Sequence, residues 1–197
     1  MQLLIATHNQ GKKREYQTIL GELGLELVAL SDLGIDHEVE ETGSTYEENA
    51  LLKAETYARL TGLPTLADDS GLEVDALGGA PGVHSARYAG PGASDRDRYL
   101  KLLAALCDVP DPERSARFRC VIAIVWTDGT HSTVDGTCEG MIARKPRGDR
   151  GFGYDPIFYL SERGVTMAML PPEIKNQISH RARAAEAARE IIRLRLA

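Results

Sequence analysis

The stretch "LLIATHNQGKKREYQTILGELGLELVAL", residues 3–30, decides the fold class of this chain. It opens with a short apolar run over residues 3–7, which predicts a buried strand. Residues 9–23 have the spacing of an amphipathic helix for which Asn9 is a suitable N-cap, and their apolar stripe consists of Tyr16, Ile19, Leu20 and Leu23. Residues 25–30 predict a second strand. A strand–helix–strand succession favours a parallel pair of strands and therefore an α/β fold.

Two more amphipathic helices are predicted in the first half of the chain. In residues 44–62, Thr45 and Glu48 fit a capping box, and Gly62 fits a C-terminal stop. Residues 94–106 form the other helix, and its apolar side is expected to carry Leu100, Leu103 and Leu106.

The middle of the chain contains the signals of strands. Residues 64–69 predict a third strand, and residues 72–79 predict a fourth that turns back after Ser70-Gly71. Residues 116–142 predict a long hairpin whose turn is marked by Asp128-Gly129. Because a hairpin is antiparallel, it cannot belong to a purely parallel sheet.

These elements together predict an α/β fold with an elongated, mixed, strongly twisted sheet. We expect helices on both faces and two lobes around a central cleft. The chain has no Pro/Gly/Ser-rich linker that would divide it, so residues 1–197 are interpreted as a single domain.

Composition excludes several classes of protein. The 197 residues are 43% hydrophobic and carry a formal net charge of −6, which disfavours non-specific binding to nucleic acid. No apolar run is long enough for a transmembrane helix, and the N-terminus does not resemble a signal peptide. The odd number of cysteines, none in CxxC spacing, predicts reduced thiols and a cytoplasmic location for Cys107, Cys120 and Cys138.

The first stretch that can carry chemistry is "ATHNQGK", residues 6–12. A strand ends there and a helix begins, so free N–H groups and the positive end of the helix dipole are available. With Thr7, Asn9 and the charge of Lys12 nearby, this is a candidate phosphate site, although it is not a P-loop. The alternative is a helix start with a solvated lysine.

The second stretch is "EVEETG", residues 38–43. An acidic loop before a helix often does no more than compensate the helix dipole. It can also supply a hard oxygen ligand to Mg²⁺, and the candidate acids are Glu38, Glu40 and Glu41.

The third stretch places Asp68 and Asp69 side by side at the end of an apolar run. The pair is either a solvated turn or a site for a metal or a general base. Neighbouring side chains of an extended strand point to opposite faces, so one acid is expected to face a ligand and the other to support it. Ser70-Gly71 can then let a ligand approach the backbone.

Two further stretches lie near the C-terminus. "GDRGFGYDPIF", residues 148–158, predicts a loop whose aromatic residues, Phe152 and Tyr154, can stack on a flat ring or fill the core. Residues 178–196 predict the last helix, with Ser179 as a possible N-cap. Around its start the chain places three cationic or donor side chains, which are Lys175, His180 and Arg181.

In combination these stretches resemble the inosine triphosphate pyrophosphatase family. "THNQGK" fits the family's phosphate motif, although His8 stands where many members have a small residue. "ETGSTYEENALLKA" fits the acidic loop and following helix, and "ADDSGLEVDALGGAPGVHSARYAG" fits the most recognisable segment. "GFGYDPIF" and "ISHR" fit the elements that recognise the base. The five motifs occur in family order from Thr7 to Arg181.

The resemblance implies a Mg²⁺-dependent homodimer that removes deaminated purine triphosphates (ITP, dITP, XTP) from the nucleotide pool by hydrolysis to the monophosphate and pyrophosphate. It implies Asp69 as base and metal ligand, Lys12 and Asp68 beside it, and either Glu40 or Glu41 as a second ligand. The remaining expected substrate-binding residues are Thr7, His8, Asn9, Gln10, Gly11, Lys53, Ser70, Phe152, Gly153, Tyr154, Asp155, Lys175, His180 and Arg181.

Physical chemistry explains why such a site prefers these bases. Hypoxanthine and xanthine carry an oxygen at purine position 6, which donors of His180, Arg181 or the loop backbone can satisfy. Adenine would leave those donors unpaired at about 1–3 kcal/mol each. The rival hypotheses are a pyrophosphatase for pyrimidine or modified triphosphates, a non-catalytic nucleotide sensor, and a nucleic-acid-binding protein.

Overall fold

The structure, a computed structural model that describes residues 1–196, contains one seven-stranded sheet in the order β2-β1-β3-β4-β5-β6-β7. The strand β1 pairs in parallel with β2 and β3, whereas β6 pairs antiparallel with β5 and β7. The predicted mixed α/β sheet is therefore confirmed. The strands are β1 (Gln2–Ile5), β2 (Glu26–Ala29), β3 (Thr65–Val74), β4 (Ser115–Val125), β5 (His131–Ile142), β6 (Phe158–Leu160) and β7 (Val165–Thr166).

Five α-helices lie within the described residues, and the chain divides into two compact units. The helices are α1 (Gln10–Leu20), α2 (Tyr46–Thr61), α3 (Asp95–Ala105), α4 (Pro172–Ile178) and α5 (His180–Leu196). The first unit comprises Met1–Asp69, Cys120–Gly136 and the chain from His180 onward, and the second comprises Ser70–Arg119 and Thr137–Ser179. None of the helices within residues 1–196 combines the length and the apolar character that crossing a membrane requires.

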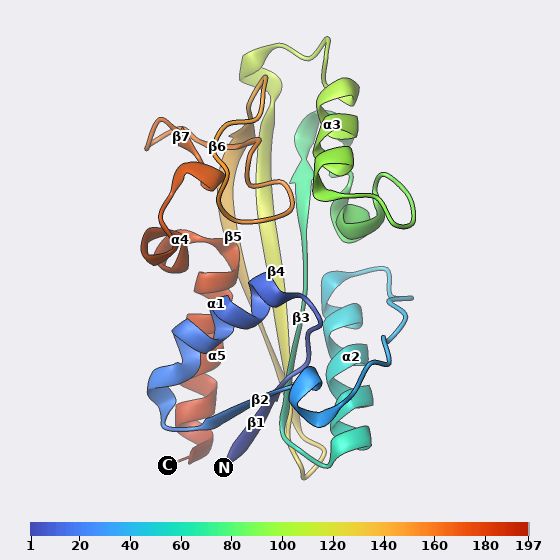
Figure 1. The fold of residues 1–197 in the computed structure, drawn as a ribbon, viewed down its shortest axis with the longest axis vertical. Coiled ribbons are helices and arrows are strands. Elements are labelled where there is room, and N and C mark those ends of the chain that lie inside the picture. The colour runs from blue at the N-terminus through green and yellow to red at the C-terminus, as the bar shows by residue number, and fades with distance from the viewer. Residues whose placement is uncertain (197) are drawn as a thin grey trace. The chain divides into compact units, whose positions relative to one another are not determined.

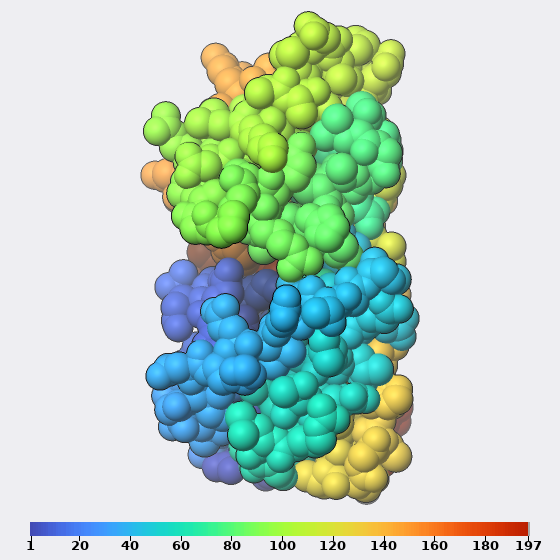
Figure 2. Space-filling view, turned by 90° about the vertical axis from the view of Figure 1, so that its right-hand side faces the viewer, coloured from blue at the N-terminus to red at the C-terminus, as the bar shows by residue number. Residues whose placement is uncertain are grey.

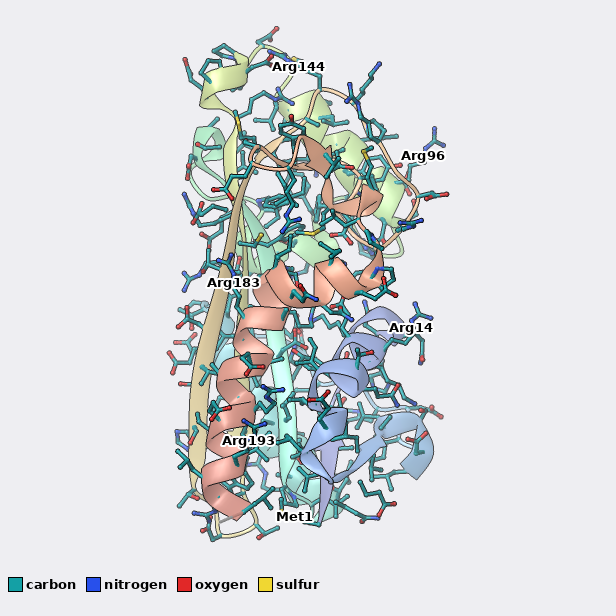
Figure 3. All side chains as sticks on the ribbon, turned by 90° about the vertical axis from the view of Figure 1, so that its left-hand side faces the viewer. Met1, Arg14, Arg96, Arg144, Arg183 and Arg193 are labelled. Atoms are coloured by element: carbon teal, nitrogen blue, oxygen red, sulfur yellow. The ribbon has the colours of Figure 1, made fainter. Side chains whose placement is uncertain are left out.

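In the first unit, α2 lies on one side of the strands and α1 with α5 on the other (Figure 1). The predicted apolar stripe of α1 is confirmed, because Tyr16 and Leu20 are fully buried in the core of this unit. Figure 3 shows α1 beside α5, with Arg14 directed away from that interface. Asn9 caps α1 as expected, since its side chain accepts hydrogen bonds from the amides of Gly11 and Lys12.

The helix α2 confirms one half of its predicted capping box. The Thr45 side chain accepts from the Glu48 amide, at 3.1 Å, and Gly62 ends the helix in the left-handed conformation. The Glu48 carboxylate, however, accepts from the amide and the hydroxyl of Ser44, at 2.7 and 2.8 Å. The expectation of a reciprocal bond to Thr45 is therefore wrong, because Ser44 offers the carboxylate two donors.

The strand β3 corrects the prediction of two strands separated by a turn. It runs without interruption from Thr65 to Val74, so Ser70-Gly71 is extended and does not reverse the chain. Leu72 and Val74 are fully buried in the core of the second unit, and the hydroxyl of Ser85 accepts from the Leu72 amide. Burial of these side chains outweighs the local turn preference of Ser-Gly.

The second unit corrects one detail of the predicted helices. In this unit α3 and α4 lie on opposite sides of the strands (Figure 1). Leu100 is exposed, whereas Leu106 is buried and Leu103 packs partly buried against the core, as expected; Leu102 is the buried residue that the prediction missed. The C-terminal helix expected at residues 178–196 is confirmed as α5, which begins at His180, and Ser179 adopts an extended backbone between it and the preceding α4. The loop predicted at residues 148–158 is confirmed except at its last residue, because residues 148–157 have neither helix nor strand and Phe158 begins β6.

A close approach of β5 to α5 gives a test of the packing in the first unit. A Cβ at Gly136 would lie 2.2 Å from the carbonyl oxygen of His180 and 2.5 Å from the amide nitrogen of Ala184. Both neighbours are backbone atoms, so Gly136→Ala is expected to lower the free energy of unfolding by about 1–3 kcal/mol. Thermal and urea denaturation measure the loss.

Gly21→Ala is the matched control. Gly21 has φ −60°, and an added Cβ would meet no heavy atom of the described residues within 4 Å. The free energy of unfolding of Gly21→Ala should differ from that of the wild type by less than about 1 kcal/mol. Equal stabilities of the two variants would contradict the close approach.

Candidate functional site

The carboxylate of Asp68 is the centre of a buried charge cluster in the first unit. Its side chain is 1% exposed, and Oδ2 accepts from Nζ of Lys12 at 2.8 Å and lies 3.7 Å from Nε of Arg181. The thiol of Cys120, whose pKa burial raises to about 12, stays protonated 3.7 Å from the same oxygen. Burial alone would raise the pKa of Asp68, but the charges of Lys12, Arg181 and Lys53 hold it well below its usual range. Asp68 is therefore ionised.

Arg181 connects this cluster to α1 through Glu15. Its Nη1 donates to Oε2 of Glu15 at 2.6 Å, and both side chains are almost completely buried. Burial disfavours the guanidinium charge, but Asp68 and Glu15 outweigh that effect and raise the pKa of Arg181. Sequence reasoning did not find Glu15. Its signal was an acid directly before Tyr16, on the buried side of α1, where a charge needs a partner.

Asp69, the next residue on β3, has a different environment. Its Oδ2 accepts from Nδ2 of Asn49 at 2.9 Å, and Glu41 acts on it in addition to Lys53 and Lys12, which also act on Asp68. Burial is the largest influence and raises the pKa of Asp69, Glu41 adds to the rise, and Lys53 and Asn49 oppose it. The two neighbouring carboxylates thus differ: Asp68 is held ionised, and Asp69 accepts a proton more readily than an ordinary aspartate.

Asn49 is a second residue that the sequence analysis missed. Its side chain is fully buried, and Oδ1 accepts from the Gly43 amide at 2.7 Å while Nδ2 donates to Asp69. A Cβ at Gly43 would lie 2.7 Å from Oδ1 of Asn49, so this approach requires glycine. Asn49 therefore holds the end of the acidic loop to the carboxylate of Asp69. A polar residue on the buried face of a predicted helix was the available signal.

Lys53 and Glu41 complete the cluster around β3. Nζ of Lys53 donates to Oε1 of Glu41 at 2.6 Å and to the backbone carbonyl of Asp68. Burial disfavours the charge of Lys53, but Asp68, Glu41 and Asp69 raise its pKa. Glu40, by contrast, is exposed. Figure 2 shows the loop before α2, in blue, at the surface beside the teal helix.

The donor set suits a cation that shares its coordination with a substrate. Within residues 1–196 no three His, Cys, Asp or Glu side chains are grouped as a ready-made metal cage. The carboxylates of Asp69 and Glu41 are nevertheless near each other, because the charge of Glu41 raises the pKa of Asp69 and both charges raise the pKa of Lys53. Mg²⁺ typically takes one or two carboxylates and completes its coordination with phosphate oxygens and water. The residues present therefore fit Mg²⁺ with a bound phosphate, and do not form an all-protein site.

The turn and helix start predicted as a phosphate site are present, with one correction. The amides of Gly11 and Lys12 are not free, because Asn9 accepts hydrogen bonds from both at 2.8 and 3.1 Å. Oγ1 of Thr7 accepts from the Asn9 amide at 3.2 Å, which fixes the turn before α1. His8 contacts the Tyr57 hydroxyl at 3.4 Å and the carbonyl of residue 37 at 3.1 Å. Gln10 is exposed at the start of the helix.

The aromatic loop forms its own cluster in the second unit. Nζ of Lys175 donates to Oδ2 of Asp155 at 2.6 Å and lies 4.5 Å from the centroid of the Phe152 ring. Lys175 and Asp155 are both buried, whereas Phe152 is partly exposed. Tyr154 is a core residue, 4% exposed, whose hydroxyl donates to the carbonyl of Ser85 at 2.8 Å. Of the two aromatic residues, Phe152 is therefore the more exposed.

The predicted site residues thus divide into two sets. The structure brings together, in the first unit, the phosphate loop, Glu41, Lys53, Asp68, Asp69 and Arg181. His180 belongs to this unit as the buried first residue of α5. The second set, Phe152, Gly153, Tyr154, Asp155 and Lys175, is gathered in the second unit, to which Ser70 also belongs.

A mixed α/β sheet with paired acids beside two lysines and a capped helix start is typical of a metal-dependent enzyme that hydrolyses phosphate anhydrides. Comparison with known proteins agrees with that class. The model of the Ham1 family matches residues 3–191, so the chain belongs to the Ham1 family.

Individual relatives are similar over nearly the whole chain. A protein named dITP/XTP pyrophosphatase from Geobacillus kaustophilus is 54% identical over 93% of this chain and 90% of its own length. Its namesake from Geobacter sulfurreducens is 55% identical, over 92% of each chain. The solved structure of a HAM1 protein from Coxiella burnetii superposes with a TM-score of 0.89 at 45% identity and covers 98% of both chains.

The buried pair of Glu15 and Arg181 gives a test of the charge cluster. Glu15→Gln keeps the shape of the side chain but removes one of the two acids that balance Arg181. Because breaking a buried ion pair leaves a charge poorly compensated, we expect a loss of about 3 kcal/mol in the free energy of unfolding. Urea denaturation at neutral pH measures it.

Glu22→Gln is the control for a surface pair of the same kind. Glu22 is 81% exposed and lies 3.7 Å from Arg189. Its loss should change stability by less than about 1 kcal/mol. If Glu15→Gln is no more destabilising than Glu22→Gln, the cluster does not depend on Glu15.

Proposed function

We propose that this chain hydrolyses deaminated purine nucleoside triphosphates (ITP, dITP and XTP) to the monophosphate and pyrophosphate. The observation that carries the proposal is the contrast on β3. Asp68 is held ionised between Lys12 and Arg181, while the pKa of Asp69 is raised beside Lys53 and Glu41. The names of the relatives, dITP/XTP pyrophosphatase, support the choice of substrate.

Asp69 is the general base in this proposal. A raised pKa makes its carboxylate a better acceptor for a proton of water at neutral pH. The water oxygen forms a bond to the α-phosphorus as the bond between that phosphorus and the bridging oxygen breaks. The proton passes to Asp69, and the bond electrons leave with pyrophosphate. Asp68 supports this step by holding Lys12 in place.

The first unit supplies the positive charge that a triphosphate needs. Lys12 and Lys53 are charged, partly buried and tied to the same strand, so they can face phosphate oxygens with little loss of side-chain entropy. The remaining residues that we assign to the phosphates are those of the loop before and into α1, which are Thr7, His8, Asn9, Gln10 and Gly11.

Asp69 and Glu41 would hold Mg²⁺ in this proposal. We assign Glu41 because its charge acts on Asp69, whereas Glu40 is exposed. The chemistry that Mg²⁺ supplies when bound is neutralisation of the negative charge on the phosphates.

The loop of the second unit provides the recognition of the base. Phe152 has a partly exposed ring, and Lys175 and the loop backbone offer donors near it. Such donors match the oxygen at position 6 of hypoxanthine and xanthine and are left unpaired by the amino group of adenine. The assignment of His180 and Arg181 to the same oxygen stays a prediction from the sequence.

We also propose that the enzyme is a cytoplasmic homodimer acting on the free nucleotide pool. All three cysteines are free thiols, and Cys107 is exposed, which suits a reducing compartment. Light scattering of the purified chain measures the mass, and a monomer at working concentration would contradict the dimer.

The function is tested with purified protein and a panel of ITP, XTP, GTP, ATP and dUTP. We expect pyrophosphate and monophosphate from ITP and XTP in the presence of Mg²⁺, and no turnover in EDTA. Asp69→Asn should lower kcat by at least about 100-fold, because its amide cannot accept the proton of water. Asp36→Asn, at an exposed acid of the same unit, should leave kcat unchanged. Faster hydrolysis of GTP or dUTP than of ITP would refute the substrate class.

The choice between the two acids of the loop has its own test. Glu41→Gln should weaken Mn²⁺ binding, measured by electron paramagnetic resonance in the presence of IMP and pyrophosphate, by at least about tenfold. Glu40→Gln alters the neighbouring, exposed acid by the same chemistry and should leave the affinity within about twofold. The reverse result would assign the ligand to Glu40.

A further inference from the structure

The loop that contains Phe152 has no regular secondary structure to fix its conformation. Residues 151–155 contain no helix or strand, and Gly151 and Gly153 adopt positive φ values of 75° and 63°. Because glycine gives the backbone many accessible conformations, the position of Phe152 depends on the side chains that bind the backbone amides of the loop. The relevant bonds are those to the two peptide groups that flank Phe152.

The peptide before Phe152 is held from within the loop. The Phe152 amide donates to Oδ2 of Asp155 at 2.9 Å. The same oxygen accepts from Lys175, so this anchor consists of buried residues already counted in the aromatic cluster.

The peptide after Phe152 is held by α3. The Gly153 amide donates to Oδ2 of Asp95 at 2.7 Å. Oδ1 of the same carboxylate accepts from Nη1 of Arg98 at 2.5 Å, and Nη2 of Arg98 donates to the carbonyl of Ala93 at 2.7 Å. Arg98 therefore fixes the orientation of the carboxylate, and the carboxylate fixes the loop. In contrast Arg96, on the same helix, points to solvent (Figure 3).

Asp95 is not needed to start its own helix. Ser94 is the N-cap of α3, and its hydroxyl accepts from the Asp97 amide while the Asp97 carboxylate accepts from the Ser94 amide. This reciprocal pair satisfies the helix start without Asp95. The Asp95 side chain is 43% exposed, yet it accepts from a loop amide 58 residues away in the sequence. We conclude that its role lies in that loop.

We propose that Asp95 is a positioning residue for purine recognition. By holding the peptide between Phe152 and Gly153, it sets the direction in which the Phe152 ring meets the base, and Arg98 keeps its carboxylate in place. The inference rests on the proposed function, because it assigns Phe152 to the purine. It predicts that the loss of Asp95 weakens discrimination between purines while the phosphate chemistry of the first unit is retained.

The test compares Asp95→Ala with Asp95→Asn. Asp95→Ala removes the acceptor for the Gly153 amide and should raise KM for ITP about tenfold, with a smaller change in kcat. The preference for ITP over GTP in kcat/KM should fall by a similar factor. Asp95→Asn retains an oxygen that can accept from the same amide, so both quantities should stay within about threefold of the wild type. Binding of IMP, measured by calorimetry without turnover, should follow the same order.

Asp97→Ala is the matched control on the same helix turn. It removes the capping box of α3 and leaves the bond to Gly153, so it should lower the melting temperature without altering the ITP to GTP preference. If Asp95→Ala does no more to the preference than Asp97→Ala, the inference is wrong. Should Asp95→Ala fail to fold, Arg98→Ala replaces it, and an unchanged preference in that variant also overturns the inference.

A double-mutant cycle with Phe152→Ala tests the route of the effect. If Asp95 acts through Phe152, Asp95→Ala should have little further effect on kcat/KM for ITP once the ring is gone. If the loss of kcat/KM for ITP in the double variant equals the product of the two single losses, Asp95 acts independently of Phe152. If the wild type hydrolyses ITP and Asp95→Ala has the same ITP to GTP preference, the inference alone is refuted. If the wild type has no activity on ITP, the proposed function is refuted.

Discussion

The ionised carboxylate of Asp68 is the group on which the polar interior of the first unit depends. Its partners are Lys12 from α1 and Arg181 from α5, and Arg181 binds Glu15 in turn, so three segments far apart in the sequence meet at one charge. A buried charge that loses its partner costs several kcal/mol. The phosphate loop, β3 and the start of α5 are therefore constrained to keep their relative positions.

Strand geometry makes two identical neighbours chemically different. Because successive side chains of β3 point to opposite faces, Asp68 enters the cation cluster and Asp69 meets Asn49 and the charges of the acidic loop. Their pKa values are moved in opposite directions as a result. A pair of titratable groups separated in this way is a frequent arrangement in catalysis, where one must stay charged and the other must exchange a proton. An extended backbone and different surroundings on its two sides are enough to make Asp68 and Asp69 differ in this way.

Features that depend on chain neighbours were predictable from the sequence, and features that depend on distant partners were not. The caps at Asn9 and Gly62 involve residues within a few positions, so residue type alone indicated them. The turn expected at Ser70-Gly71 was wrong because burial further along β3 is decided by the tertiary core. In the site, the aspartate pair was indicated by its composition. Glu15, however, has its partner 166 positions away at Arg181, and a pattern of neighbouring residues does not indicate a partner so distant in the sequence.

The two clusters differ in what their chemistry can distinguish. Charges such as Lys12 and Lys53 attract every nucleoside triphosphate alike, because the phosphates are the same in all of them. Under the proposed function, discrimination falls to the loop of residues 151–155, where Lys175 lies against the Phe152 ring. A mobile loop would adapt its donors to a wrong base, whereas a loop whose peptide groups are held on both sides of Phe152 cannot. Selectivity then depends as much on the residues that hold the loop as on those that touch the base.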